Sequence, residues 1–177
     1  MNLINSKCTD LTKHFESLHD GDLTIIGLQP KMCPVGIWTE GYGNAIIDPA
    51  TGKFLTGSGN KGRASLLSDI YDEAGASTQL EKNLVRYSDK ALRIVNMLAM
   101  KFDDDKFSSL VSFIYNLGAG ALKNMLTSYK NGMDINKVFL LYRFAKVDGV
   151  KTELPGLVRR RKAEAWLFTT GKVKFNF

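Results

Sequence analysis

Apolar residues near the start of the chain recur every three or four positions: Ile4, Cys8, Leu11, Phe15 and Leu18. This spacing places them on one face of an α-helix. The polar segment that follows contains Gly21 between two aspartates, which is typical of a turn. The pattern therefore predicts an amphipathic N-terminal helix that ends near His19.

Residues 23–47 change to a β-rich pattern. Two runs, 23–29 and 36–47, flank Cys33–Gly36, whose Pro and Gly favour a tight turn. We expect a β-hairpin here, with several glycines that allow a neighbour to approach the backbone closely. A loop rich in Gly, Thr and Ser is expected to follow over residues 48–62.

The remainder of the chain has helical periodicity. A long helix is predicted from Ser77, where a capping pattern precedes apolar positions that continue to Leu98. Asp103 can cap the next helix, which we expect to end at Gly118. Further helices are expected over residues 121–129, over residues 135–144, and from Pro155 onwards, where proline suits a first helical turn.

The order of these elements predicts an α+β fold. A small β-hairpin lobe, about residues 20–65, is joined by a long helix to a mostly helical lobe, about residues 76–177. The N-terminal helix is expected to pack with the helical lobe. A chain of 177 residues has the length of one compact domain, so residues 1–177 are predicted to form a single domain.

The net charge of +6 favours binding to polyanions, which include nucleic acid, anionic membrane surfaces and acidic wall polymers. No stretch approaches the roughly 20 apolar residues that span a bilayer. The first 15 residues carry polar and charged groups throughout and do not resemble a secretory signal. We therefore expect a cytoplasmic protein without stable membrane insertion, released to the wall by something else.

The two cysteines, Cys8 and Cys33, are too few for a disulfide framework, and we expect both to be thiols. Neither has a second Cys or a His at the spacing of metal ligands. The sequence therefore predicts no metal site and no cofactor.

One carboxyl stands where the predicted N-terminal helix meets the predicted hairpin. Glu16 follows Phe15 on the last turn of that helix. Cleavage of a glycosidic bond needs a protonated carboxyl beside the leaving oxygen and a second group that positions water or stabilises the oxocarbenium ion. A carboxyl partly removed from water keeps its proton to higher pH. Glu16 is therefore the candidate general acid of a glycosidase.

Three separated segments resemble the phage-type lysozyme family. Residues 15–18 followed by Cys33–Gly43 are similar to its FEG…(D/C)PxGxxTxGYG signature. Residues 113–118 resemble its F-x-x-N-x-G helix, and residues 154–164 resemble its LPGLxxRRxxE segment. The resemblance implies a lysozyme-like fold and an endolysin that hydrolyses the β-1,4 bond between N-acetylmuramic acid and N-acetylglucosamine in peptidoglycan. It also implies inversion at the anomeric carbon.

The same resemblance implies the site residues. Glu16 takes the position of the catalytic acid, Cys33 that of a second acidic residue that is Asp or Cys in the family, and Thr39 that of its threonine. Cys33 and Thr39 would flank the attacking water. The residues that would lie along the substrate cleft are Ala45, Tyr115 and Asn116.

Two features depart from the family pattern. Sixteen residues separate Glu16 from Cys33, more than in the usual form, so residues 19–26 have the character of an insertion at the base of the hairpin. This insertion would bring Asp20 and Asp22 near the acid. The family's GYGH reads GYGN here, with Asn44 in place of a histidine that could hold Glu16 or an adjacent acid.

Several of these residues also have structural interpretations. Cys33 fits a small buried residue in a turn, and Thr39 fits ordinary strand propensity. Trp38, Tyr42 and Tyr115 suit a core as well as they suit sugar stacking.

Two charged features are left out of the site. Glu40 alternates to the opposite face of the strand from Thr39. Arg159–Lys162 resembles a nucleic-acid patch, but successive helical residues point about 100° apart, so the run spreads around the helix. We expect some of these arginines to pair with acids and the rest to be solvated.

Three functions compete on the sequence alone. The first is the endolysin, acting on glycan strands as a monomer, with a holin as the pore that releases it. The second is a catalytically inactive lysozyme-fold protein that binds peptidoglycan or is structural, motivated by the longer spacing and the absent histidine. The third is a basic nucleic-acid-binding protein, which lacks a recognisable binding motif. We expect the endolysin, with no nucleic-acid partner.

Overall fold

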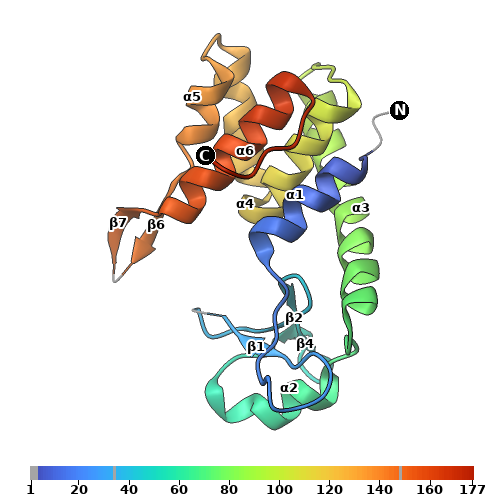
Figure 1. The fold of residues 1–177 in the computed structure, drawn as a ribbon. Helices are drawn as coiled ribbons and strands as arrows, with labels where there is room; N and C mark the ends of the chain where they lie inside the picture. Colours follow the sequence, from blue (N-terminus) through green and yellow to red (C-terminus); the bar gives the residue numbers. More distant parts are fainter. Residues whose placement is uncertain (1–3, 34, 148) are drawn as a thin grey trace. The chain divides into compact units, whose positions relative to one another are not determined.

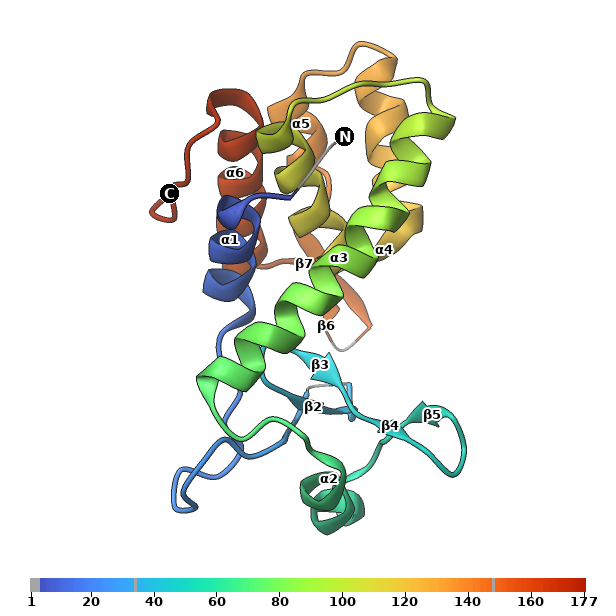
Figure 2. The ribbon, with the colours of Figure 1, turned by 90° about the vertical axis from the view of Figure 1, so that its right-hand side faces the viewer.

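The computed structural model describes residues 4–33, 35–147 and 149–177, and its ribbon is drawn in Figures 1 and 2. The chain divides into two compact units. The first, called here the β unit, runs from Glu16 to Asn83. The second, the helical unit, comprises the chain up to Phe15 and from Leu84 to Phe177. The N-terminal helix therefore belongs with the C-terminal half of the chain.

The helical unit contains most of the helices and one small hairpin. Its elements are α1 (Ser6–Glu16, up to Phe15), the later part of α3 (Glu73–Met97), α4 (Asp104–Lys130), α5 (Ile135–Leu140), β6 (Phe144–Val147), β7 (Val150–Glu153) and α6 (Pro155–Thr170). Strands β6 and β7 pair antiparallel. Within the described residues, no helix combines the length and the apolar character needed to cross a bilayer.

The core of the helical unit lies among α4, α5 and α6. Phe113 and Phe139 meet edge to face with ring centroids 5.6 Å apart, and Phe139 meets Phe168 at 6.1 Å. Leu11 on the apolar face of α1 packs against Leu167 of α6. The helical spacing read from the sequence therefore identifies the buried face of α1 correctly.

Two helix starts and one break within a helix occur at the residues that the sequence assigns to them. The Asp103 carboxylate accepts a hydrogen bond from the Lys106 N–H at 2.8 Å and caps α4. Gly118 interrupts α4 with φ 81° and ψ 175°, a conformation that favours glycine, so the predicted helix end is a break within one element. Pro155 is the first residue of α6, as predicted.

The β unit contains short strands, one short helix and the start of α3. Its elements are β1 (Lys31–Met32), β2 (Trp38–Glu40), β3 (Asn44–Ala45), β4 (Ile47–Asp48), β5 (Lys53–Phe54), the 3₁₀ helix η1 (Ser58–Asn60) and α2 (Lys61–Leu67). Strands β1, β2 and β3 form an antiparallel sheet, and β4 pairs with β5. A small core of Trp38, Ile46, Leu55 and Ala64 lies beneath these strands and α2.

The strand predicted over residues 23–29 is absent, and the strand before the Cys33 turn is β1 instead. Asp20 Oδ1 accepts hydrogen bonds from the N–H groups of Asp22 and Gln29, and Asp22 Oδ1 accepts from Thr24. Side-chain acceptors of this kind compete with strand pairing and curl the chain into turns. The aliphatic residues of this segment are exposed: Leu23, Ile25 and Ile26.

Three further boundaries differ from the sequence prediction. The helix expected over residues 135–144 ends at Leu140, and Phe144 begins a hairpin that the sequence pattern did not reveal. The segment expected as a loop over residues 48–62 contains the end of β4, all of β5 and η1, and the start of α2, a helix that the sequence analysis did not predict. Helix α3 begins at Glu73 rather than Ser77, because Asp72 Oδ1 accepts the Gly75 N–H one turn earlier.

Candidate active site

Glu16 is the last residue of α1 and the first residue of the β unit. Ser17 follows with φ 58°, a left-handed conformation that ends the helix. Glu16 Oε2 lies against Gly43, where a Cβ atom would be only 3.4 Å away and where φ is 79°. The positive φ favours glycine at position 43, and the Glu16 carboxyl group lies beside the turn between β2 and β3.

Thr39 lies in the middle of β2 and is flanked by both neighbouring strands. It pairs with Lys31 of β1 on one side and with Ala45 of β3 on the other. Its hydroxyl donates a hydrogen bond to the Lys31 carbonyl at 2.9 Å. Its orientation is therefore set by the sheet.

His19 contacts the candidate residue Thr39, and the sequence interpretation missed this contact. Its Nδ1 lies 2.9 Å from Thr39 Oγ1, and its backbone N–H donates to the Gly41 carbonyl at 2.9 Å. Burial lowers the pKa of its imidazole below the usual value and Lys31 lowers it further, whereas the Glu16 carboxylate acts to raise it. A signal was available, because His19 is the one histidine between Glu16 and the hairpin.

Cys33 lies in the turn between β1 and β2 and is half-buried. Its N–H donates to the Ile37 carbonyl, and its own carbonyl accepts from the Gly36 N–H, both at 2.8 Å. Its thiol is free, as is that of Cys8. Pro34, which the sequence places in the same turn, lies outside the described residues. The catalytic role of Cys33 stays a prediction.

Two of the predicted cleft residues belong to the helical unit. The ring of Tyr115 on α4 packs against that of Tyr87, with the ring centroids 5.1 Å apart. Asn116 Oδ1 accepts a hydrogen bond from Arg161 Nη2 at 2.9 Å. The third, Ala45, is in the β unit with Glu16, Cys33 and Thr39. The structure thus brings four of the six predicted site residues into one unit. Their roles stay predictions.

Glu40 is bound within a buried polar network of the β unit. Its carboxylate accepts hydrogen bonds from Asn44 Nδ2 at 3.0 Å, from Ser68 Oγ at 2.7 Å and from the Asp69 N–H at 3.2 Å. Asn44, which stands where the family signature has histidine, also accepts from Asn83. Thr39, the neighbour of Glu40 on β2, has different partners. This agrees with the expectation that the two side chains point to opposite faces of the strand, for which Glu40 was left out of the site.

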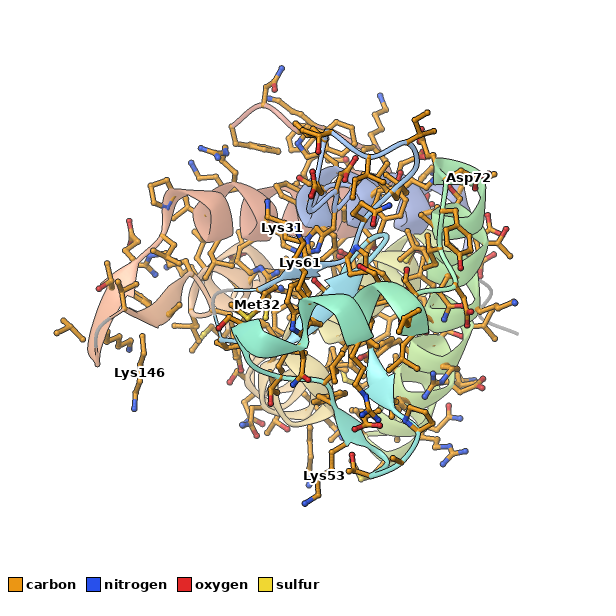
Figure 3. All side chains as sticks on the ribbon, turned by 90° about the horizontal axis from the view of Figure 1, so that it is seen from below. Lys31, Met32, Lys53, Lys61, Asp72 and Lys146 are labelled. Carbon is orange, nitrogen blue, oxygen red and sulfur yellow. The ribbon has the colours of Figure 1, made fainter. Side chains whose placement is uncertain are left out.

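Asp20 and Asp22 have structural partners of their own. Both carboxylates accept backbone N–H groups of their own loop, as described above. Asp22 also forms an ion pair with Lys61, the first residue of α2, whose Nζ lies 3.1 Å from Asp22 Oδ2. Lys61 is labelled in Figure 3. Hydrogen bonds from Thr24 and Lys61 hold the pKa of Asp22 below its usual value. An acid that ionises so readily is poorly suited to donate a proton to a leaving group.

The basic run at the start of α6 is divided between the interior and the surface. Arg160 and Arg161 are buried, and both bind Glu164, at 3.2 Å and 3.0 Å. Arg159 and Lys162 are exposed. The expectation that some of these arginines pair with acids is therefore confirmed, and the run does not form one continuous basic surface.

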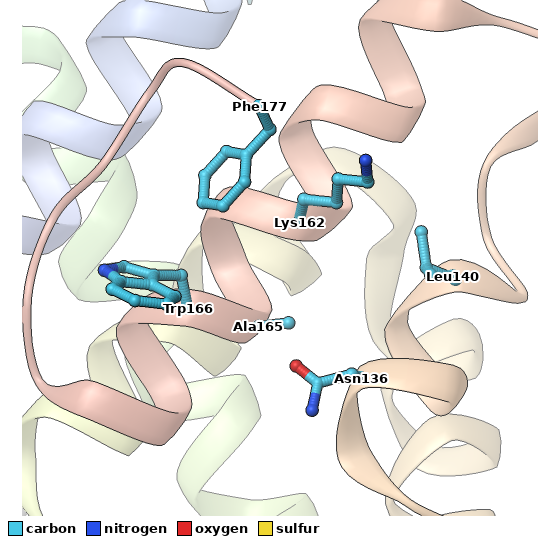
Figure 4. A pocket seen from close by; sticks show the side chains of 6 residues that line it. All are labelled: Asn136, Leu140, Lys162, Ala165, Trp166 and Phe177. Atoms are coloured by element: carbon cyan, nitrogen blue, oxygen red, sulfur yellow. The ribbon is translucent and has the colours of Figure 1, made fainter.

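A cavity of about 110 Å³ in the helical unit is drawn in Figure 4. It is lined by residues of α5, of α6 and of the C-terminal segment: Asn136, Leu140, Lys162, Ala165, Trp166 and Phe177. None of the predicted site residues lines it. Within the described ranges, no cluster of three or more His, Cys, Asp or Glu side chains could hold a metal ion.

Comparison with known protein families identifies the family of this chain. The sequence model of the phage lysozyme family matches residues 25–164. This chain belongs to the phage lysozyme family. It is a glycoside hydrolase of the lysozyme type, from a family that degrades peptidoglycan. The matched span includes Cys33 and Thr39, whereas Glu16 precedes it.

One similar sequence aligns with nearly the whole chain. The chain is 26% identical over 171 residues to an endolysin of Acyrthosiphon pisum secondary endosymbiont phage 1, covering 93% of this chain and 97% of the relative.

Solved structures share the fold. They include the endolysin of Escherichia coli O157:H7 phage FAHEc1, with a TM-score of 0.73, 21% identity and coverage of 97% of this chain and 96% of that one. The muramidase domain of SpmX from Asticaccaulis excentricus has a TM-score of 0.69, 22% identity and coverage of 96% and 99%. The active form of the P1 phage endolysin Lyz has a TM-score of 0.61, 20% identity and coverage of 95% and 85%. The predicted α+β, lysozyme-like fold is therefore confirmed.

Proposed function

We propose that this phage lysozyme family member hydrolyses the β-1,4 bond between N-acetylmuramic acid and N-acetylglucosamine, with Glu16 as general acid. The observation that carries the proposal is the position of the Glu16 carboxyl, which lies against Gly43 at the edge of the strands that hold Thr39 and Ala45. A carboxyl there can donate its proton to a glycosidic oxygen while a water approaches from the Thr39 side.

The stereochemical outcome follows from the role given to Thr39 and Cys33. In an inverting glycosidase, water attacks the anomeric carbon on the face opposite the departing oxygen. We propose that Thr39 and Cys33 flank this water and that Ala45, Tyr115 and Asn116 contact the sugar. The products would then have the α configuration at the new reducing end, which proton NMR of freshly cleaved glycan strands detects.

The deciding experiment compares Glu16→Gln with Glu81→Gln, the same change at an exposed position of α3. Glutamine keeps the size of the side chain and cannot donate the acid proton. Glu16→Gln should therefore slow lysis of permeabilised Gram-negative cells on the order of a hundredfold or more. Glu81→Gln should lyse them at the wild-type rate. If Glu16→Gln clears cells as fast as its control, Glu16 is not the acid, and Asp20 becomes the next residue to test.

The second candidate function is binding of peptidoglycan without hydrolysis. It is favoured by the longer spacing between Glu16 and Cys33 and by Asn44, which replaces the histidine of the family signature. Co-sedimentation with purified peptidoglycan that releases no reducing ends would establish it. Release through a pore formed by a holin, the monomeric state and the absence of nucleic-acid binding stay predictions.

A further inference from the structure

The hydrogen bonds of Thr39 leave its hydroxyl with one open position. A hydroxyl has one hydrogen and two acceptor lone pairs. The hydrogen points to the Lys31 carbonyl at 2.9 Å. Nδ1 of His19, also at 2.9 Å, must then carry a hydrogen of its own and donate it to Oγ1. One lone pair of Oγ1 remains.

His19 is held firmly enough to fix this arrangement. Its backbone N–H is tied to the Gly41 carbonyl, in the turn between β2 and β3. Its ring is half-buried and is faced by Glu16 of α1, Lys31 of β1 and Thr39 of β2. Residues 19–26 lengthen the spacing between Glu16 and Cys33, so the ring comes from the segment that departs from the family pattern.

We propose that His19 is a positioning residue that fixes the orientation of the Thr39 hydroxyl. In this orientation the remaining lone pair of Thr39 Oγ1 accepts a hydrogen bond from the attacking water. The proposal rests on the function proposed above. With its hydrogen committed to Lys31 and one lone pair committed to His19, Thr39 can only accept from this water. The water then directs its own lone pair at the anomeric carbon. No proton passes to His19 or Thr39: the proton that the water loses as the new C–O bond forms goes to solvent, from which Glu16 regains the proton it gave to the leaving oxygen.

The lowered pKa of His19 suits this role. A neutral ring with a hydrogen on Nδ1 makes the bond to Thr39 without placing a positive charge beside Glu16.

A double-mutant cycle tests the coupling of the two side chains, with kcat and KM measured on soluble, uncross-linked glycan strands by release of reducing ends. His19→Ala should lower kcat about three- to tenfold, the loss of one hydrogen bond, and leave KM unchanged. In a Thr39→Ala background the same substitution should change kcat less than about twofold, because the hydroxyl it orients is gone. His14→Ala, an exposed histidine of the helical unit, should match the wild type.

A conservative variant separates positioning from packing. The Asn side chain can place an N–H near the position of Nδ1, so His19→Asn should recover kcat to within about twofold of the wild type. The inference is overturned if His19→Ala lowers kcat by the same factor in both backgrounds, or if folded His19→Asn is as slow as His19→Ala. These outcomes are distinct from failure of the proposed function, which would appear as an active Glu16→Gln variant.

Discussion

The buried carboxylate of Glu164 should be costly to remove from the helical unit. It is fully buried and accepts hydrogen bonds from Arg160 Nε at 3.2 Å, Arg161 Nη2 at 3.1 Å and Ser112 Oγ at 3.0 Å. Its second oxygen lies 3.0 Å from Arg161 Nε. Glu164→Ala would leave two buried guanidinium groups without this carboxylate.

The size of the effect follows from that burial. Removing one partner of a buried ion pair costs about 3–5 kcal/mol, because the remaining charge stays out of water and loses that partner. Two arginines share Glu164, so we expect about 4–5 kcal/mol. At about 2–4 °C per kcal/mol for a chain of this length, the melting temperature should fall by about 8–20 °C.

The matched control is an exposed pair of the same chemistry. Glu153 binds Arg143 on the hairpin side of the helical unit, with its side chain 51% exposed. Exposed ion pairs contribute at most about 1 kcal/mol, so Glu153→Ala should lower the melting temperature by a few degrees or less. Urea and thermal unfolding of both variants, followed by circular dichroism, give the comparison. A Glu164→Ala variant no less stable than Glu153→Ala would refute the assignment of Glu164 as a buried, shared counter-ion.

Three further predictions concern titratable side chains. A thiol reagent should modify Cys33 but not Cys8 in the native protein, because Cys8 is buried and burial raises the pKa of its thiol to about 12. Both cysteines should react after denaturation, and mass spectrometry counts the modified thiols. Rapid modification of Cys8 in the native protein would contradict this prediction. If Cys33 flanks the attacking water, the Cys33→Asp variant should retain lysis, and the Cys33→Ala variant should lose it without a change in melting temperature. If the thiol is only packed in the turn, Cys33→Asp should unfold the hairpin and Cys33→Ala should stay active. Because the pKa of His19 is lowered on folding, the unfolded chain binds its proton more readily, so stability should be full above about pH 6.5 and fall as the pH drops below it. Urea unfolding at about pH 5 and about pH 7.5 should show this loss in the wild type and a smaller loss in His19→Asn, whereas equal losses would rule out His19 as its source.

The sequence alone predicted the four longest helices of this protein, α1, α3, α4 and α6, but not α2. Helical periodicity is a local property, and the apolar spacing that identifies α1 also identifies the face, including Leu11, that is buried in the structure. Asp103, Gly118 and Pro155 act within one turn of their own backbone, so their effect on α4 and α6 could be predicted without the fold. Glu16 could be proposed as the acid because its place at the end of a helix is set locally and because the residues around it and downstream of it resemble the family signature.

The tertiary structure decided the strands and the partners within the site. The strands of the β unit are two or three residues long, which is too short for alternation to show, and their pairing depends on residues that are distant in the chain. Asp20 and Asp22 turned a β-rich run into a loop by accepting its N–H groups, leaving β1 to pair with β2. The contact of His19 with Thr39 joins residues twenty positions apart and appears only once the sheet is assembled. Spacing along the chain fixes which residues share a face, but a hydrogen bond between side chains of different elements requires the folded geometry that brings their atoms within about 3 Å.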